Sequence, residues 1–252
     1  MFFVISTGRS GTGTLAATLS QSPSLHCGHE TTRELIRLSM ERAHHDRAPE
    51  DVERELRALY EHRAAAPGES RHQGESDHHA FNLVEMLARV LPGSRYVWLV
   101  RDGREVVASA AARGWYGSAL RREDPGRFPL REYYEFYRVR GDLCGEVEAA
   151  EWAGMSPFER CCWYWSYVNR TIGAQLRALP RRRWTAVRLE RLEEEVGRVV
   201  ELLDARPFPF SVEHENRADY SVRRHPEWTA GEHAAFARWC GDEMDRWYPG
   251  WR

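Results

Sequence analysis

The sequence predicts an α/β fold in which helices cover both faces of a parallel β-sheet. Three short segments, Phe2–Ser6, Arg95–Val100 and residues 184–189, are rich in aromatic and β-branched residues and predict buried strands. A segment with helical patterning follows each of them. Strands that alternate with helices in this way are typical of a parallel sheet buried between two helical layers.

Helices are expected where apolar residues recur at helical spacing. Residues 66–79 are rich in Gly, His and Ser and predict a loop. Residues 114–157 are irregular and aromatic, and we expect them to form a helical and aromatic cap, because long insertions in compact domains are often lids. No repeat or linker interrupts the chain, so residues 1–252 are expected to form a single domain. The expected helices span Thr12–Ser20, 30–44, 49–65, 81–90, 103–113, 158–179, 193–203 and Ala230–Trp247.

Charge and cysteine content argue against several classes of function. The formal net charge of −2 makes nucleic acid and anionic membranes unexpected partners. The five cysteines lack the spacing of a zinc site, so no metal is expected. No segment approaches the roughly 20 apolar residues of a membrane span, and the first apolar run is too short for a signal peptide. We therefore expect a reduced, cytoplasmic protein.

The first predicted strand ends at a glycine-rich turn, residues 8–14 (GRSGTGT), that leads into a helix. Such a turn points backbone N–H groups at an anion, and the helix dipole favours negative charge there. A nucleoside-triphosphate loop would have the pattern GxxxxGK[ST]. Gly8 and Gly13 have that spacing, but Thr14 replaces the lysine, and the chain contains no lysine at all. The expected phosphate-binding residues are Arg9, which supplies the charge, and Ser10, Gly11, Thr12, Gly13 and Thr14.

This loop resembles the 5′-phosphosulfate loop of the sulfotransferases that use PAPS (3′-phosphoadenosine 5′-phosphosulfate), in the Arg-Ser-Gly-Thr form of carbohydrate and tyrosylprotein sulfotransferases. Residues 99–109 (LVRDGREVVAS) are similar to the family's 3′-phosphate motif, which implies that Arg101 and Ser109 bind the 3′-phosphate. Residues 187–192 (VRLERL) resemble a late strand segment of these enzymes. The resemblance implies a P-loop NTPase-like fold, PAPS as the donor, PAP as the product and no metal.

Residues 27–31 (CGHET) resemble the CGEET segment of tyrosylprotein sulfotransferases, whose second glutamate is the proposed base. The resemblance implies that Glu30 removes the acceptor proton. The alternative is that Glu30 only begins the next helix, where an acidic residue is favourable. The family's second-strand lysine is absent, and residues 74–79 lie in the corresponding region. His78 or His79 could replace that cation or act as the base.

The resemblance implies that a C-terminal basic segment that contains Arg223 and Arg224 could close over the nucleotide; the alternative is that both arginines are simply exposed. The acceptor is expected to be a small molecule with a hydroxyl group, bound under the aromatic cap. Glu132 and Glu135 in that cap would tolerate a cationic acceptor. Two alternatives stay open: a P-loop kinase with an atypical loop, which would bind ATP with magnesium, and a non-catalytic regulatory protein that binds PAP or PAPS.

Overall fold

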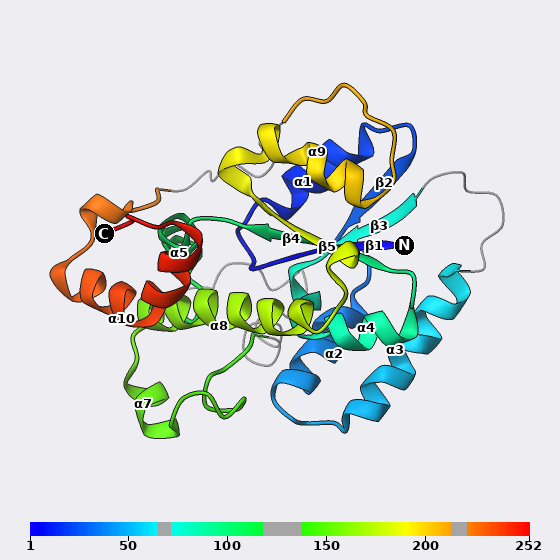
Figure 1. The fold of residues 1–252 in the computed structure, drawn as a ribbon. Helices are drawn as coiled ribbons and strands as arrows, with labels where there is room; N and C mark the ends of the chain where they lie inside the picture. Colours follow the sequence, from blue (N-terminus) through cyan, green and yellow to red (C-terminus); the bar gives the residue numbers. More distant parts are fainter. Residues whose placement is uncertain (65–71, 118–137, 213–220) are drawn as a thin grey trace.

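The computed structural model describes residues 1–64, 72–117, 138–212 and 221–252. Within this part of the chain, five parallel strands form one sheet in the order β2-β3-β1-β4-β5 (Figure 1). The predicted α/β fold with a parallel sheet is confirmed. The strands are β1 Phe2–Ser6, β2 Leu25–His29, β3 His72–Ser76, β4 Arg95–Val100 and β5 Trp184–Arg188.

Helices cover both faces of the sheet, with α1 and α9 on one side and α2 to α5, α8 and α10 on the other (Figure 1). No helix in the described ranges is both long enough and apolar enough to cross a bilayer. The α-helices are α1 Thr12–Ser20, α2 Glu34–Ala43, α3 Pro49–Ala64, α4 Val84–Val90, α5 Gly103–Ala112, α7 Ala149–Gly154, α8 Pro157–Arg177, α9 Leu192–Leu202 and α10 Ala230–Trp247. The 3₁₀ helices are η1 His78–Asn82, η3 Arg181–Arg183, η4 Leu189–Arg191 and η5 His225–Glu227.

The central strand β1 supplies side chains to two separate hydrophobic cores. Successive side chains of a strand point to opposite faces of the sheet. Phe2 and Val4 therefore join the core beneath α1 and α9, whereas Phe3 and Ile5 join the larger core beneath α8. All four side chains are buried, which explains the uninterrupted apolar run that marks this strand in the sequence.

Two strands, β2 and β3, lie where the sequence predicted no strand. Strand β3 falls within the expected loop at 66–79, and β2 ends where a helix was expected to begin; that helix, α2, begins at Glu34 instead. The sequences of these strands, LHCGH and HQGES, contain no run of apolar residues. The polar side chains of β3 can nevertheless be buried, because they have hydrogen-bond partners inside the protein. Glu75 is 1% exposed and accepts hydrogen bonds from two threonines and a tyrosine.

The cap expected at residues 114–157 is described only in part. Residues 118–137, which include Glu132 and Glu135, lie outside the described residues. In the described part, Trp115 and Trp152 are buried, and the Trp152 ring packs edge-on against Trp163 of α8 at 5.0 Å between ring centroids. These indoles belong to the main hydrophobic core.

The carboxyl ends of β1, β3 and β4 meet at one edge of the sheet. Val4 of β1 pairs with Ser76 of β3, and Ser6 of β1 pairs with Leu99 of β4. The segments that follow these three strands therefore lie side by side. In parallel α/β sheets this edge is where ligands bind.

Candidate active site

The loop between β1 and α1 has the backbone conformation of an anion-binding turn. Arg9 and Gly11 have positive φ angles of 64° and 81°, and such turns gather successive N–H groups around an anion. Gly11 is the N-cap of α1, and no side chain caps the helix there, so its first N–H groups can bind a ligand. A side chain has no room at Gly8, where a Cβ would lie 2.5 Å from the Trp115 ring.

The polar side chains of the loop hold it in shape. The Ser10 and Thr7 hydroxyl groups are hydrogen bonded to each other. Thr12 Oγ1 lies 3.0 Å from His29 Nε2 at the end of β2. Gly13 and Thr14 are buried in the first turn of α1.

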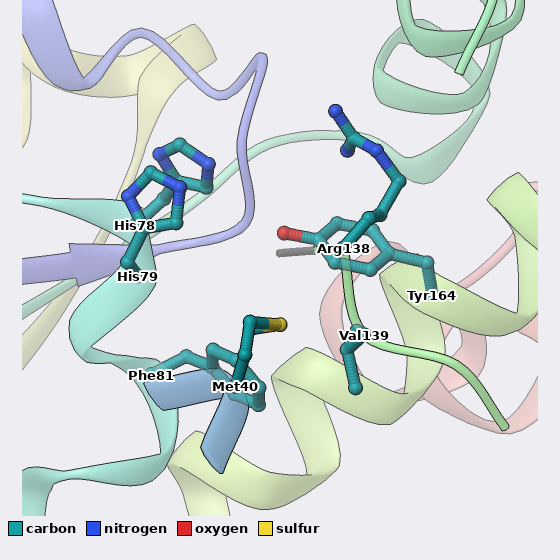
Figure 2. Close-up of a pocket in the computed structure, with 7 residues that line it drawn as sticks. All are labelled: Met40, His78, His79, Phe81, Arg138, Val139 and Tyr164. Carbon is teal, nitrogen blue, oxygen red and sulfur yellow. The ribbon is translucent and has the colours of Figure 1, made fainter. Parts of the chain in front are cut away.

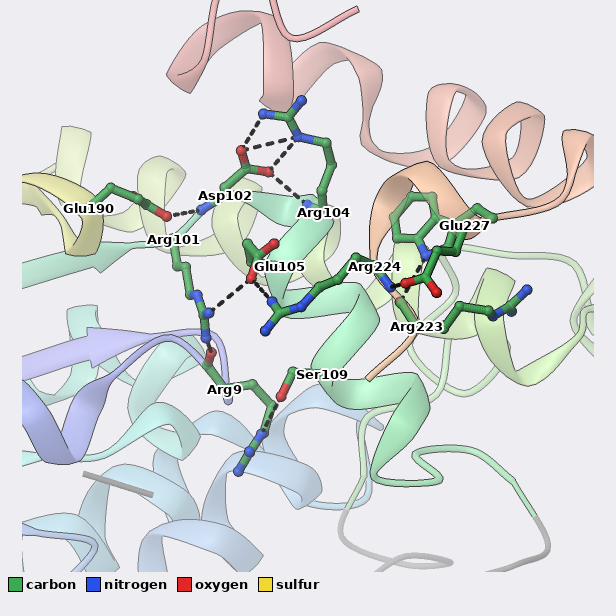
Figure 3. Close-up of polar contacts among 11 residues, drawn as sticks. Arg9, Arg101, Asp102, Arg104, Glu105, Ser109, Glu190, Arg223, Arg224 and Glu227 are labelled. Carbon is green, nitrogen blue, oxygen red and sulfur yellow. Dashed lines mark hydrogen bonds and ion pairs between the residues drawn. The ribbon is translucent and has the colours of Figure 1, made fainter. Parts of the chain in front are cut away.

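The second predicted motif contacts this loop directly (Figure 3). Arg9 Nε donates to Ser109 Oγ of α5 at 3.0 Å. Arg101, at the end of β4, donates from Nη1 to the Arg9 carbonyl oxygen at 2.9 Å. The structure thus brings Arg9 together with two other predicted phosphate-binding residues, Arg101 and Ser109, which lie 92 and 100 residues further along the chain.

The two C-terminal arginines take different positions (Figure 3). Arg224 pairs with Glu105 of α5, and Glu105 also accepts from Arg101 Nη2 at 3.3 Å. Arg224 therefore lies next to the predicted 3′-phosphate motif. Arg223 pairs instead with Glu232 at the start of α10, so this side chain is directed away from that motif.

The segment 187–192 has a contact that its sequence did not predict. Glu190 Oε1 accepts from the backbone N–H of Asp102 at 2.9 Å, directly after Arg101. Asp102 in turn caps α5 by accepting from the Arg104 N–H at 2.8 Å. The late strand segment therefore helps to fix the turn that carries Arg101.

A buried carboxylate holds the turn that carries Glu30. Glu75 Oε1 accepts from Thr31 Oγ1 at 2.9 Å and from the Thr32 N–H at 2.7 Å. Its Oε2 accepts from Thr32 Oγ1 at 2.7 Å and from the Tyr60 hydroxyl at 3.0 Å. Glu30 itself has a φ of 51°. No local pattern in the sequence indicated this role of Glu75, because the partners named here come from two other segments, the Thr31–Thr32 turn and α3.

Glu30 and His78, predicted as alternative bases, form a hydrogen-bonded pair. Glu30 Oε1 lies 3.0 Å from His78 Nδ1 and 3.6 Å from His29 Nε2. Because a carboxylate only accepts, His78 Nδ1 carries the proton, which leaves its Nε2 able to accept one. Glu30 is about 40% exposed at its side chain, whereas His78 is 12% exposed.

The pKa shifts of the pair agree with this proton placement. Burial lowers the pKa of His78, as does its neighbour His79, and these effects outweigh the hydrogen bond and charge of Glu30, which raise it. The ring is therefore neutral at pH 7. Burial raises the pKa of Glu30, but the hydrogen bond with His78 and the nearby histidines outweigh burial and lower it, so Glu30 is ionised. A neutral imidazole next to a carboxylate is suited to accept a proton.

His79 lies behind His78 and is held by Asp77. The two rings are 3.8 Å apart at their centroids, and His79 Nδ1 lies 2.7 Å from Asp77 Oδ1. Asp77, His78 and His79 each place one ligand atom within 4.8 Å of the others, so these side chains could hold a metal ion. The expectation that the protein uses no metal stays a prediction.

A small pocket of about 10 Å³, roughly the room that one water molecule needs, opens beside the histidines (Figure 2). His78 and His79 line one side of it, and Arg138 and Tyr164 line the other, with the Tyr164 hydroxyl directed toward the histidines. Burial raises the pKa of Tyr164 to about 12, so this hydroxyl stays protonated at neutral pH. The sequence did not single out either residue, since Arg138 is one of many arginines and Tyr164 is one of several aromatics in α8. The other lining residues are Met40, Phe81 and Val139.

A family model described as the sulfotransferase family matches residues 2–153, which are more than half of the chain. No curated protein matches the sequence significantly.

Solved structures with the same fold include two sulfotransferases. One is a sulfotransferase from Alicyclobacillus acidocaldarius, with 16% identity, a TM-score of 0.51 and coverage of 95% of this chain and 94% of that one. The other is the sulfotransferase domain from the curacin biosynthetic pathway, with 16% identity, a TM-score of 0.51 and coverage of 83% and 75%. At this identity the likeness shows the fold alone. Together with the family match, it leads to one conclusion: the chain belongs to the sulfotransferase family.

Proposed function

We propose that this protein transfers the sulfuryl group of PAPS to the hydroxyl group of a small-molecule acceptor. The observation that carries the proposal is the direct contact between the two predicted phosphate motifs, through Arg9, Ser109 and Arg101. A donor with a phosphate at each end of its ribose needs two anion sites at a fixed separation. The loop with positive φ at Arg9 provides one site, and the end of β4 with α5 provides the other.

In the proposed donor site, different residues bind the two phosphates. The N–H groups of residues 8–13 and the Arg9 guanidinium would hold the 5′-phosphosulfate, and Arg101 and Ser109 would hold the 3′-phosphate. Arg224 can join them, because Glu105 already holds it next to Arg101. Positive charge near the bridging oxygen stabilises the negative charge that forms when the sulfuryl group leaves. In a chain without lysine, Arg9 and the loop N–H groups are our candidates for that task.

The Glu30–His78 pair is proposed to remove the acceptor proton. The hydroxyl oxygen forms a bond to sulfur while the bond from sulfur to the 5′-phosphate oxygen breaks, and His78 Nε2 takes the hydroxyl proton. PAP leaves with the electron pair of the broken bond. Glu30 orients the imidazole through Nδ1 and stabilises the imidazolium, which makes it a positioning residue for His78.

Isothermal titration calorimetry with PAP tests the proposed function. We expect PAP to bind without magnesium at concentrations below about 1 mM, the upper end of ordinary KM values. Matched titrations with ATP and magnesium test the kinase alternative. Binding of ATP only, with no heat from PAP at millimolar concentration, would contradict the proposal.

A transfer assay separates an enzyme from a binding protein. The protein is incubated with PAPS and a panel of hydroxyl compounds, and PAP and sulfated products are followed by mass spectrometry. The proposal expects stoichiometric PAP and sulfate ester with at least one acceptor. PAP binding with no turnover across the panel would favour the regulatory alternative.

A further inference from the structure

The turn that carries Arg101 is bonded to a segment far away in the sequence, residues 248–251 after helix α10. Glu190 connects the two: its Oε1 accepts from the Asp102 N–H at 2.9 Å, and its Oε2 accepts from the Tyr248 hydroxyl at 2.9 Å. One carboxylate thus links the end of α10 to the start of α5. Because Asp102 directly follows Arg101, the Tyr248 hydroxyl is two hydrogen bonds away from the backbone of the predicted 3′-phosphate motif.

A second contact joins the same two elements. Arg104 donates from Nη1 to the Trp251 carbonyl oxygen at 3.1 Å, and its Nε donates to Asp102 Oδ1 at 3.0 Å (Figure 3). Trp251 is buried, and its ring packs edge-on against Phe236 of α10 at 5.4 Å between ring centroids. The segment 248–251 is therefore packed onto the fold and can serve as a fixed support for the turn.

The Tyr248 hydroxyl is a stable donor to Glu190. Burial and the negative charge of Glu190 raise the pKa of Tyr248, so this hydroxyl keeps its proton at neutral pH. A hydrogen bond to a carboxylate is shorter and stronger than one between neutral groups. Two such bonds orient the Glu190 carboxylate, which gives the Asp102 N–H an acceptor at a fixed position.

The position of Arg101 sets the spacing of the two proposed phosphate sites. Its Nη1 donates to the Arg9 carbonyl oxygen at 2.9 Å, so its guanidinium lies next to the loop proposed to bind the 5′-phosphosulfate. A guanidinium binds phosphate through N–H groups with fixed directions, so a small displacement of its backbone weakens the contact. AMP has no 3′-phosphate and would not use this contact. Support for Arg101 should therefore favour PAP over AMP.

We propose that Tyr248, acting through Glu190, is a positioning residue for Arg101 and thereby strengthens the preference of the donor site for a 3′-phosphate. The Trp251 carbonyl supports the same turn through Arg104. This inference rests on the proposed binding of PAPS. No motif in the sequence pointed to Tyr248, because it lies far from Arg101 along the chain.

The test compares the affinities for PAP and AMP in calorimetric titrations. Tyr248→Phe removes one hydrogen bond from Glu190 and should weaken PAP binding by about fivefold, while AMP affinity stays within about twofold of the wild type. Glu190→Ala removes both bonds and should weaken PAP binding by at least about tenfold. Glu190→Gln should restore most of the preference, because the amide oxygen can accept from the Asp102 N–H and the NH₂ group can donate to the Tyr248 oxygen.

A double-mutant cycle tests whether Tyr248 acts through Glu190. In the Glu190→Ala background, Tyr248→Phe should change PAP affinity by less than about twofold, since the bond that it removes is already absent. The matched control is Tyr96→Phe, at the other end of β4, where the Tyr96 hydroxyl lies 2.7 Å from Ser94 Oγ. This control should lower the unfolding midpoint, which is measured for every variant, and leave the ratio of PAP to AMP affinity unchanged.

Three results would overturn the inference. The first is a Tyr248→Phe protein whose affinities for PAP and AMP both match those of the wild type. The second is an equal fall in both affinities together with a lower unfolding midpoint, which would make the role of Tyr248 structural only. The third is an additive loss of PAP affinity in the double variant, which would mean that Tyr248 does not act through Glu190. Failure of the wild type to bind PAP more tightly than AMP would instead contradict the proposed function itself.

Discussion

Glu75→Gln is the substitution that tests most closely how the protein holds the turn that carries Glu30. Glu75 is 1% exposed, and its two oxygens accept four hydrogen bonds of 2.7 to 3.0 Å. In glutamine one of the two oxygens becomes an NH₂ group, which cannot accept. The amide should place that group at the Oε2 position, because the Thr32 and Tyr60 hydroxyls there can rotate to accept, whereas the Thr32 N–H at Oε1 cannot.

The size of the effect follows from these bonds. A hydrogen bond to a charged group contributes about 1.5–3 kcal/mol and a neutral one about 0.5–1.5 kcal/mol. Four weakened bonds, partly offset because no charge is buried any longer, should lower the free energy of unfolding by about 2–3 kcal/mol. For a chain of this size that corresponds to a Tm lower by roughly 4–12 °C. Because the Thr31–Thr32 turn also carries Glu30, kcat should fall by roughly tenfold while PAP affinity stays the same.

Urea unfolding, calorimetric titration with PAP and a kinetic assay of PAP release measure these three quantities. Tyr60→Phe is the control, since it removes one of the four hydrogen bonds and leaves the three bonds to Thr31 and Thr32 in place. It should cost about 1 kcal/mol and leave kcat close to that of the wild type. A Glu75→Gln protein as stable and as active as the wild type would refute the assignment of Glu75 as the anchor of this turn.

Three further predictions concern the proposed base and the loop. His78→Asn should lower kcat by roughly 10²- to 10⁴-fold with PAP affinity unchanged, as PAP release and calorimetry can measure. Burial lowers the pKa of His78, so the acid limb of the kcat–pH profile should lie below pH 6.5; Glu30→Gln, which removes contributions that raise this pKa, should move the limb to still lower pH. Gly8→Ala should weaken PAP binding by at least about tenfold, because its Cβ would lie 2.5 Å from the Trp115 ring, whereas Gly154→Ala, with no atom within 4 Å of its Cβ, should not.

The sequence predicts well those parts of the fold whose residues act locally. Strands β1 and β4 have the expected bounds because both are buried on two faces and are apolar except at one end, at Ser6 of β1 and Arg95 of β4. Strand β3 could not be predicted, since its polar residues are stabilised by partners such as Thr32 and Tyr60 that are distant in sequence. A segment whose stability depends on such partners has no local signal.

In the candidate site, too, residues in local motifs could be predicted, whereas contacts between distant residues could not. Arg9, Arg101 and Ser109 lie in compact motifs, and their order along the chain was enough to expect them at one sheet edge. Glu30 and His78 were both candidates for the base, yet only the structure shows that they are hydrogen bonded across 48 positions. Arg138 belongs to no sequence motif, and only the structure places it in the pocket beside the histidines.

The central claim, that the two motifs form one site for a donor with two phosphates, is tested most directly by comparing PAP with AMP, which lacks the 3′-phosphate. Both ligands are titrated into the wild type, into Arg101→Met and into Arg95→Met, which changes the other end of the same strand. The wild type should bind PAP more tightly than AMP by on the order of 10²-fold, and Arg101→Met should lose most of that difference while Arg95→Met keeps it. Equal binding of PAP and AMP by the wild type would contradict the claim.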